Sequence, residues 1–300
     1  MNGVINVLKP PGMTSSDVVV FLRRILRERK VGHTGTLDPA AAGVLPICIG
    51  KATKLSDYIM ADRKTYRCGL TLGMETDTLD AEGRIVRTSS KIPEYNEIER
   101  VFYQFRGKMR QVPPMYSAIK VRGKKLYELA REGKEIEVKP REIEIYSSRI
   151  IRFTEPDKLF FEVECSKGTY IRSLCRDIGE LLECGAYMSF LIRLRSGIFD
   201  LSNAITLDEI EKRVQSGDRT SFVMTMDSVL VNMNVIHFKE SAYPYLLNGN
   251  KIEIKHSISD VKQFKEDELL KVYCKGTFMG LGTIIKEGNE RFLRIKKLLI

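Results

Sequence analysis

The segment GHTGTLDPAAAGVLP, residues 32–46, is the most informative part of the chain. It fits neither helical nor strand periodicity, and its single carboxylate, Asp38, is followed at once by Pro39. A residue before proline favours extended geometry, and glycine permits close approach of another backbone, so the pattern predicts a loop that presents Asp38. A structural connector rich in glycine is the alternative, because the spacing matches neither a P-loop nor a dinucleotide fingerprint.

Residues 32–39 and 41–45 resemble the signature of the TruB family of tRNA pseudouridine synthases. The resemblance implies that Asp38 is the essential catalytic residue and that the enzyme isomerises the T-loop uridine at tRNA position 55 without a cofactor or metal. His33 matches a family histidine that enters the space vacated by flipped bases, which makes it a substrate-binding candidate. A general base is the alternative role for His33, because an imidazole titrates near neutral pH.

The turn KPPGMTS, residues 9–15, follows a predicted buried strand over residues 4–8. It resembles the first motif of the same family, which supports the catalytic loop, and Lys9 is a substrate-binding candidate on that resemblance. A helix capped by Ser15 or Ser16 is predicted to follow the turn.

Residues 64–72 alternate with period two, which predicts a strand with Tyr66 on its apolar face. Such a tyrosine is usually a core aromatic. The resemblance implies instead that Tyr66 packs against the target base, and it is a candidate to take a proton from the sugar. Leu194, in a predicted strand over residues 186–195, is implied to line the uridine pocket, with ordinary core packing as the alternative.

A second family signature, SKGTYIRSL, covers residues 166–174 and crosses from a strand into a helix. Arg172 falls in the first helical turn, where a cation opposes the helix dipole, so an anionic partner is expected. The resemblance implies that this partner is Asp38, which Arg172 orients and keeps ionised by lowering its pKa. Composition alone favours an arginine solvated on the helix surface. Tyr170 of the same motif is a substrate-binding candidate.

Residues 105–125 carry seven cations and no acid, which suggests a phosphate-facing segment. The resemblance implies an inserted arm over about residues 105–142 that grips the T stem-loop, and a solvated basic loop is the alternative. The acids of residues 75–80 are interpreted as turn formers and loop anchors. The candidate RNA-binding cations are Arg106, Lys108, Arg110, Lys120, Arg122, Lys124 and Lys125.

The expected fold class is α+β. The resemblance implies the mixed, largely antiparallel sheet of the pseudouridine synthase fold, flanked by helices, in a catalytic domain over residues 1–230. Thr206 begins a capping-box pattern and opens a predicted helix. Short strand-like runs in residues 231–300 predict a small β-barrel that resembles a PUA domain, an RNA-binding module.

A formal net charge of +10 points to a polyanionic partner. The resemblance implies that this partner is tRNA. The six cysteines are far apart and lack a C-x-x-C pair, so free thiols are expected rather than a zinc site. The N-terminus lacks a signal-peptide pattern, and no apolar run approaches about 18 residues. We therefore expect a cytoplasmic monomer without a metal.

Two rival functions remain at this level. A non-catalytic RNA-binding or RNA-folding protein needs only the basic segment and the PUA-like tail, and a related pseudouridine synthase acts on guide-directed or ribosomal RNA. For the isomerisation itself, a carboxylate in a dry pocket can form a covalent bond or stabilise a glycal, and both routes stay open.

Overall fold

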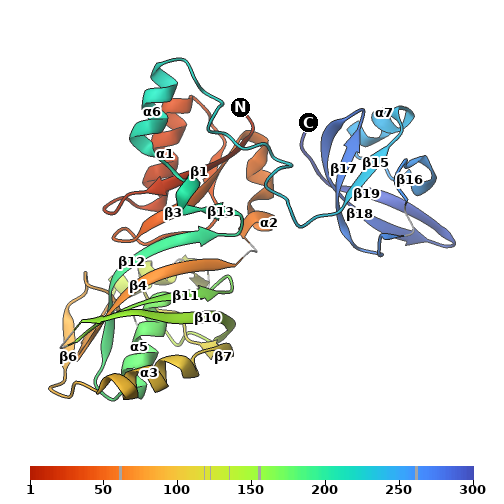
Figure 1. Cartoon of the computed structure of the whole chain (residues 1–300). Helices are drawn as coiled ribbons and strands as arrows, with labels where there is room; N and C mark the ends of the chain where they lie inside the picture. Colours follow the sequence, from red (N-terminus) through yellow and green to blue (C-terminus); the bar gives the residue numbers. More distant parts are fainter. Residues whose placement is uncertain (61–62, 118, 122, 135, 155–156, 261–262) are drawn as a thin grey trace.

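The computed structural model describes residues 1–60, 63–117, 119–121, 123–134, 136–154, 157–260 and 263–300. Within these ranges the chain forms one large sheet, a second sheet near the C-terminus, and helices that pack on both (Figure 1). None of the described helices has the length and hydrophobicity that crossing a bilayer requires.

The large sheet contains ten strands of the described chain. Neighbouring strands run antiparallel except for the parallel pairs β1–β14 and β3–β12, so the predicted mixed, largely antiparallel sheet is confirmed. In addition, β13 (Phe199–Asp200) pairs with β12, and β2 (Val31–His33) pairs with β3. The order is β14 (Ile205–Thr206), β1 (Gly3–Lys9), β3 (Ala42–Ile49), β12 (Ala186–Ser196), β4 (Lys64–Leu72), β11 (Lys158–Cys165), β10 (Arg141–Thr154) and β7 (Gly107–Gln111).

The signature segment contains strand residues that its periodicity did not indicate. β3 begins at Ala42, and every one of its residues after Ala42 is buried. A strand covered on both faces is apolar throughout instead of alternating, which hides the period of two. The prediction of irregular structure is therefore wrong for residues 42–46, and also for residues 32–33, which belong to β2, so the loop itself comprises residues 34–41.

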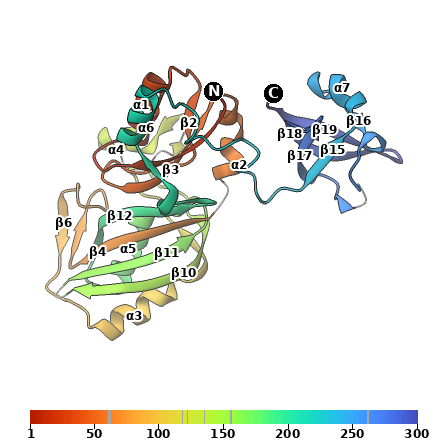
Figure 2. The same cartoon turned by 45° about the horizontal axis from the view of Figure 1, so that its top comes forward.

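Helices cover one face of the sheet in two groups. α1 (Ser15–Leu26) and α6 (Leu207–Gln215) lie side by side over the β1–β3 half, whereas α3 (Tyr95–Gln104) and α5 (Ile171–Leu181) cover the β4–β11–β10 half (Figure 1, Figure 2). Fully buried side chains such as Leu22 of α1 and Ile178 of α5 join strand residues in a single apolar core. The loop 34–41 lies between the two groups.

The helix caps agree with the sequence signals, with one correction. Thr206 caps α6 through its side chain, as the capping-box spacing predicts. The N-cap of α1 is Thr14, not Ser15 or Ser16, and Thr14 forms a reciprocal capping box with Asp17. The error is one residue, because several adjacent hydroxyl residues carry the same local signal.

A curled sheet of five strands in the described chain lies near the C-terminus (Figure 1). It has its own core around Val272. Leu281 and Leu299 of this part pack with Leu55 of the N-terminal part in a third apolar cluster, so the two parts are in contact. Strand order is β15 (Val235–Phe238), β17 (Leu269–Cys274), β18 (Thr277–Glu287), β19 (Glu290–Leu298) and β16 (Ile252–Glu253), and α7 (Tyr243–Leu247) follows β15.

The proposed arm is shorter than its predicted limits. β7 is the edge strand of the large sheet and pairs with the first residues of β10, so residues 107–111 and 141–142 belong to the sheet. Residues 112–140 lie between these two strands. Shorter elements complete the chain: α2 (Ser56–Met60), β5 (Met74–Thr76), β6 (Ile85–Thr88), β8 (Lys120–Val121), β9 (Lys124–Lys125) and α4 (Leu126–Arg131).

Candidate active site

The loop 34–41 is anchored on both sides of Asp38 by the turn that follows β1. The backbone N–H of Gly12 donates to Pro39 O at 2.9 Å. The Ser15 hydroxyl donates to Leu37 O at 3.1 Å and accepts from Leu37 N at 2.9 Å. The Leu37 side chain is buried in the core. The chain is therefore fixed immediately before and after Asp38, whose side chain keeps 34% of its surface exposed.

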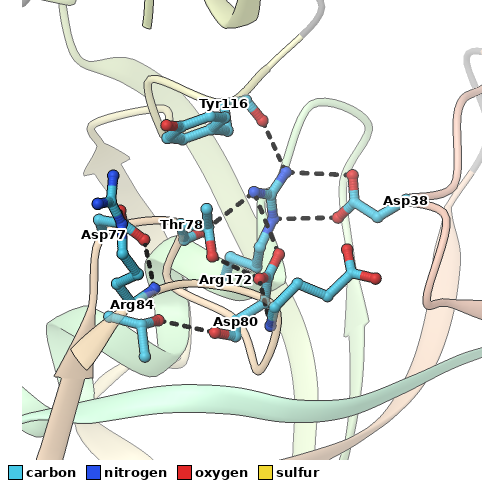
Figure 3. A network of polar contacts seen from close by, with 9 residues as sticks. Asp38, Asp77, Thr78, Asp80, Arg84, Tyr116 and Arg172 are labelled. Carbon is cyan, nitrogen blue, oxygen red and sulfur yellow. Dashed lines mark hydrogen bonds and ion pairs between the residues drawn. The ribbon is translucent and has the colours of Figure 1, made fainter. Parts of the chain in front are cut away.

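Arg172 meets the Asp38 carboxylate with two donors (Figure 3). Arg172 Nε lies 3.0 Å from Asp38 Oδ2, and Arg172 Nη2 donates to Asp38 Oδ1 at 3.1 Å. This two-pronged geometry is the one that guanidinium and carboxylate groups favour. Arg172 is the second residue of α5 and is 6% exposed. The predicted contact is confirmed, and the alternative of an arginine solvated on the helix surface is wrong.

The other donors of Arg172 hold two further segments (Figure 3). Arg172 Nη1 donates to Thr78 O at 3.1 Å and lies 3.5 Å from Asp80 Oδ2, while Nη2 also donates to Tyr116 O at 2.8 Å. Asp80 does anchor its turn, because Thr78 Oγ1 donates to Asp80 Oδ1 at 2.5 Å. Its position as a second carboxylate on Arg172 was missed by sequence reasoning, since no local pattern distinguishes it from an ordinary turn aspartate.

The pKa of Asp38 is raised above its usual value, mainly by burial. Arg172 lowers the pKa, as the sequence analysis predicts, but the negative charge of Asp80 raises it further. Arg172 therefore favours the ionised carboxylate, whereas burial and Asp80 favour the protonated form.

Tyr66 lies on β4 with its side chain buried. The pKa of Tyr66 is raised by burial, and the negative charge of Asp38 raises it further, so the phenol is protonated at neutral pH. The effect of Asp38 means that its carboxylate lies near the phenol. A protonated phenol donates a hydrogen bond and is a poor proton acceptor. The location next to Asp38 agrees with the sequence analysis.

Arg193 is a residue that sequence reasoning missed. It stands directly across from Tyr66 on the neighbouring strand β12, its charge lowers the pKa of the Tyr66 phenol against the effect of burial, and it is 1% exposed. The available signal was a charged residue at an inward position of the predicted strand over residues 186–195. The resemblance pointed instead to the next residue, Leu194, which is half-buried in the structure.

The remaining substrate-binding candidates lie around this centre. His33 ends β2 and is half-buried, and burial together with Arg193 lowers its pKa, so its imidazole is neutral at neutral pH. Tyr170 is the N-cap residue of α5. Its backbone N–H and carbonyl form two hydrogen bonds with the Gln111 side chain, at 2.8 and 3.1 Å, which joins α5 to the edge strand β7.

Lys9 is placed below the loop rather than on the surface of the site. Its side chain is 0% exposed, and its ammonium group donates to Pro10 O at 2.8 Å, Met13 O at 2.5 Å and Pro39 O at 3.1 Å. All three donors are used on backbone carbonyls, one of them next to Asp38. This position does not support direct substrate binding by Lys9, and it agrees with the supporting role implied for the turn over residues 9–15.

Lys9 is expected to make stability depend on pH. Burial lowers the pKa of Lys9 from 10.5 to about 8, so its charged form is penalised in the folded state below pH 8. Between about pH 8 and pH 10.5 the folded state loses the proton first and the penalty disappears, so the contribution of Lys9 to stability rises with pH. Relative to Lys9→Met, the wild type should gain about 1 to 2 kcal/mol of unfolding free energy between about pH 7 and 9.5.

Urea unfolding of both proteins at the two pH values measures this gain. Lys139→Met, which replaces an exposed lysine, is the control and should show no such change. A constant difference between wild type and Lys9→Met would contradict the lowered pKa.

Gly43 is required where β3 and β12 touch. Its φ is +112°, and a Cβ there would lie 2.3 to 2.9 Å from backbone atoms of Arg193. We expect Gly43→Ala to cost about 3 kcal/mol or more of unfolding free energy. Gly32→Ala is the control, because its Cβ meets nothing within 4 Å. Chemical denaturation should separate the two variants clearly, and equal stabilities would refute the proposed clash.

Two cations of the predicted basic segment stand opposite acids of the neighbouring strand. Lys108 and Arg110 of β7 stand opposite Glu144 and Glu142 of β10. Arg106 is tied to β10, because its Nε and Nη2 donate to Ser148 Oγ at 3.1 Å and Ser148 O at 2.6 Å. Residues 105–125 contain no acid, but acids that are distant in the sequence lie beside their cations in the sheet.

The other four candidate cations can be placed only in part. Lys124 lies 3.3 Å from Glu132 in an exposed ion pair. Arg122 lies outside the described residues, and only the backbone of Lys120 and Lys125 is described. Across the described residues, no group of three or more His, Cys, Asp or Glu side chains is arranged to hold a metal ion.

Two family models match the chain. The model described as "TruB family pseudouridylate synthase (N terminal domain)" matches residues 23–171, and that described as "tRNA pseudouridylate synthase B C-terminal domain" matches residues 172–236. Together they contain both signature motifs and all the residues around Asp38 and Arg172 described above, except those of the turn after β1.

Relatives named "tRNA pseudouridine synthase B" match over their full length. The protein from Alkaliphilus oremlandii is 47% identical over 300 residues, covering 100% of this chain and 99% of the relative. That from Clostridioides difficile is 46% identical over 303 residues, covering 100% of both.

Solved structures share the fold. One titled "Crystal Structure of a Cbf5-Nop10-Gar1 Complex" matches with a TM-score of 0.76 and 26% identity over 99% of this chain and 85% of that one. Another, "Structure of H/ACA RNP bound to a substrate RNA containing 2'-deoxyuridine", matches with a TM-score of 0.74 and 25% identity, again over 99% and 85%.

Proposed function

The chain belongs to the TruB family of pseudouridylate synthases, and we propose that it isomerises uridine to pseudouridine at position 55 in the T loop of tRNA. The observation that carries this proposal is the two-pronged pairing of Asp38 with the buried Arg172, with Tyr66 beside it, inside a full-length match to tRNA pseudouridine synthases.

The isomerisation requires that the glycosidic bond breaks, that the base turns while still enclosed, and that a carbon of the base rejoins the sugar. Asp38 supplies the ionised carboxylate, by attack on the substrate or by stabilising positive charge on the sugar. Arg172 orients Asp38 and favours its ionised form. Tyr66 packs against the base. To reach Asp38 the uridine leaves the stack of its loop, which costs a few kcal/mol.

Substrate recognition extends beyond the catalytic residues. His33, Tyr170 and Leu194 are proposed to contact the flipped nucleotide and its neighbours. The arm, now residues 112–140, is proposed to grip the T stem-loop together with the basic residues around it. Arg172 supports this arrangement, because it hydrogen-bonds Tyr116 O within that segment and Asp38 at the same time.

The division of the chain follows from the same reasoning. We place the catalytic domain at residues 1–230 and a PUA-like RNA-binding domain at residues 231–300, each with its own apolar core. The protein is proposed to act as a monomer in the cytoplasm, where its six buried free cysteines stay reduced.

The deciding experiment incubates the purified protein with an isolated T stem-loop transcript, without guide RNA or other proteins, and measures pseudouridine by mass spectrometry. We expect conversion of the single T-loop uridine. Conversion that occurs only after a guide RNA is added would support the guide-directed alternative. RNA binding without any conversion would support a non-catalytic RNA-binding protein.

A further inference from the structure

Arg193 is a buried cation that the proposed catalytic roles leave unexplained. It is among the largest fully buried side chains in the protein. No ion pair joins it to a carboxylate within 4.0 Å among the described residues, although 19 such pairs occur elsewhere in that part of the chain. Burying a charge without a counter-charge is costly, so its contacts must provide a compensating benefit.

The hydrogen bonds of Arg193 reach both ends of the loop that carries Asp38. Arg193 Nε donates to Val44 O at 2.6 Å, just after the loop, and Nη2 donates to Gly35 O at 3.2 Å, near its beginning. These two carbonyls lie nine positions apart in the sequence, and one planar group joins them. The guanidinium thereby closes the base of the loop over residues 34–41.

The backbone of Arg193 holds the same loop a second time. Arg193 is the register partner of Gly43 in the parallel pair of β12 and β3, and the two backbones approach so closely that a Cβ at Gly43 would collide with Arg193 O, N and C. This close approach fixes Gly43, two residues after the loop, against β12.

Tyr66 is the third group that Arg193 reaches. The two residues are direct cross-strand partners of β4 and β12. The positive charge of Arg193 also acts on the Tyr66 phenol, whose pKa it lowers against the effect of burial. Arg193 thus contacts the residue proposed to pack against the base and the loop that presents the carboxylate.

From these contacts we propose that Arg193 is a positioning residue that sets the distance between Asp38 and Tyr66, so that the flipped uridine lies between them in reactive geometry. This proposal rests on the proposed function. Arg193 itself acts through Tyr66 and the loop and does not touch the substrate. Its fork is essential, because a lysine ammonium lacks the planar pair of donors that reaches Val44 O and Gly35 O together.

The test separates positioning from folding. Arg193→Lys and Arg193→Met are compared with Arg195→Met, a control two residues along the same strand whose side chain is 47% exposed and pairs with Glu164. For each protein we measure the rate of pseudouridine formation at saturating T stem-loop, the Kd for that RNA, and the thermal midpoint.

For Arg193→Lys we expect the rate to fall about 30- to 100-fold with Kd within about threefold of wild type, whereas Arg195→Met should stay within about twofold. Adding Tyr66→Phe to Arg193→Lys should slow the reaction by much less than Tyr66→Phe does alone, because both changes disrupt one arrangement.

A folded Arg193→Lys with the wild-type rate, a loss confined to Kd, or additive rate losses with Tyr66→Phe would each overturn the inference. If Arg193→Met fails to fold, the lysine variant still decides. If wild type does not modify the T stem-loop at all, the proposed function fails first, and the two failures are thereby distinguished.

Discussion

Replacing Asp38 with asparagine is expected to abolish pseudouridine formation and leave RNA binding nearly unchanged. The amide has almost the same shape, but it carries no charge and cannot act as a nucleophile. Loss of a reacting group typically costs about 10⁴-fold or more in rate, so product from Asp38→Asn should fall to the background of the assay. RNA affinity should change less than about threefold, because phosphate contacts supply most of it.

Asp80→Asn is the matched control for this prediction. Both carboxylates lie on Arg172, but the Asp80 side chain is 13% exposed whereas that of Asp38 is 34% exposed. An asparagine at 80 still accepts the hydrogen bond from Thr78, so we expect a rate loss below about tenfold. Because Asp80 raises the pKa of Asp38, its neutralisation should also extend activity to lower pH.

Rates and RNA binding of the two variants are measured on the same T stem-loop. Undiminished turnover by Asp38→Asn would remove the carboxylate from the chemistry. Equal losses for both variants would mean that the two acids act as one structural unit.

Replacing Arg172 with methionine is expected to have the second largest effect. The change leaves Asp38 and Asp80 without a cation and leaves Thr78 O and Tyr116 O without their donor. Breaking a buried pair costs about 3 to 5 kcal/mol, and we expect about 3 kcal/mol here because Asp38 is partly open to solvent. The rate should fall about 10²- to 10³-fold through loss of orientation.

The pH profile gives Arg172→Met a signature that instability alone does not produce. Arg172 lowers the pKa of Asp38, so its removal raises that pKa further. Asp38 must be ionised to act, and the rate of the variant should therefore decline at a higher pH than that of wild type as the pH is lowered. Arg176→Met is the control, because Arg176 lies on the same helix but pairs with Asp177 and Glu180 instead of Asp38.

Arg176→Met should change the unfolding free energy by less than about 1 kcal/mol and leave the pH profile in place. An Arg172→Met protein with the wild-type pH profile would show that Arg172 does not control the ionisation of Asp38. Measurements of kcat from pH 5 to 9, with the folded fraction verified at each pH, decide between these outcomes.

Local patterns predicted much of the fold. The alternation at Tyr66, the helix start at Thr206 and the strand-to-helix transition in residues 166–174 depend on neighbours close in the sequence, and the structure agrees with each. β3 was missed because burial on both faces removes the alternation that identifies a strand. The cap of α1 was misplaced by one residue for an equally local reason.

The prediction of the site depended more on the family resemblance than on local sequence patterns. Asp38 and Arg172 were joined in advance by two family motifs, and their contact is present. Arg193 and Asp80 were not predicted as site residues. Strand register places Arg193 opposite Tyr66, and the turn between β5 and β6 places Asp80 beside Arg172. Strand register likewise showed that Glu142 and Glu144 stand opposite two cations of the basic segment.

By itself, the sequence determined the local path of the backbone that presents Asp38, because a proline after Asp38 and glycines around it act within a few residues. Tertiary structure alone decided which charges surround Asp38 and hence the direction of its pKa shift. Electrostatic energy depends on distance through space and on burial, and neither is a property of sequence separation.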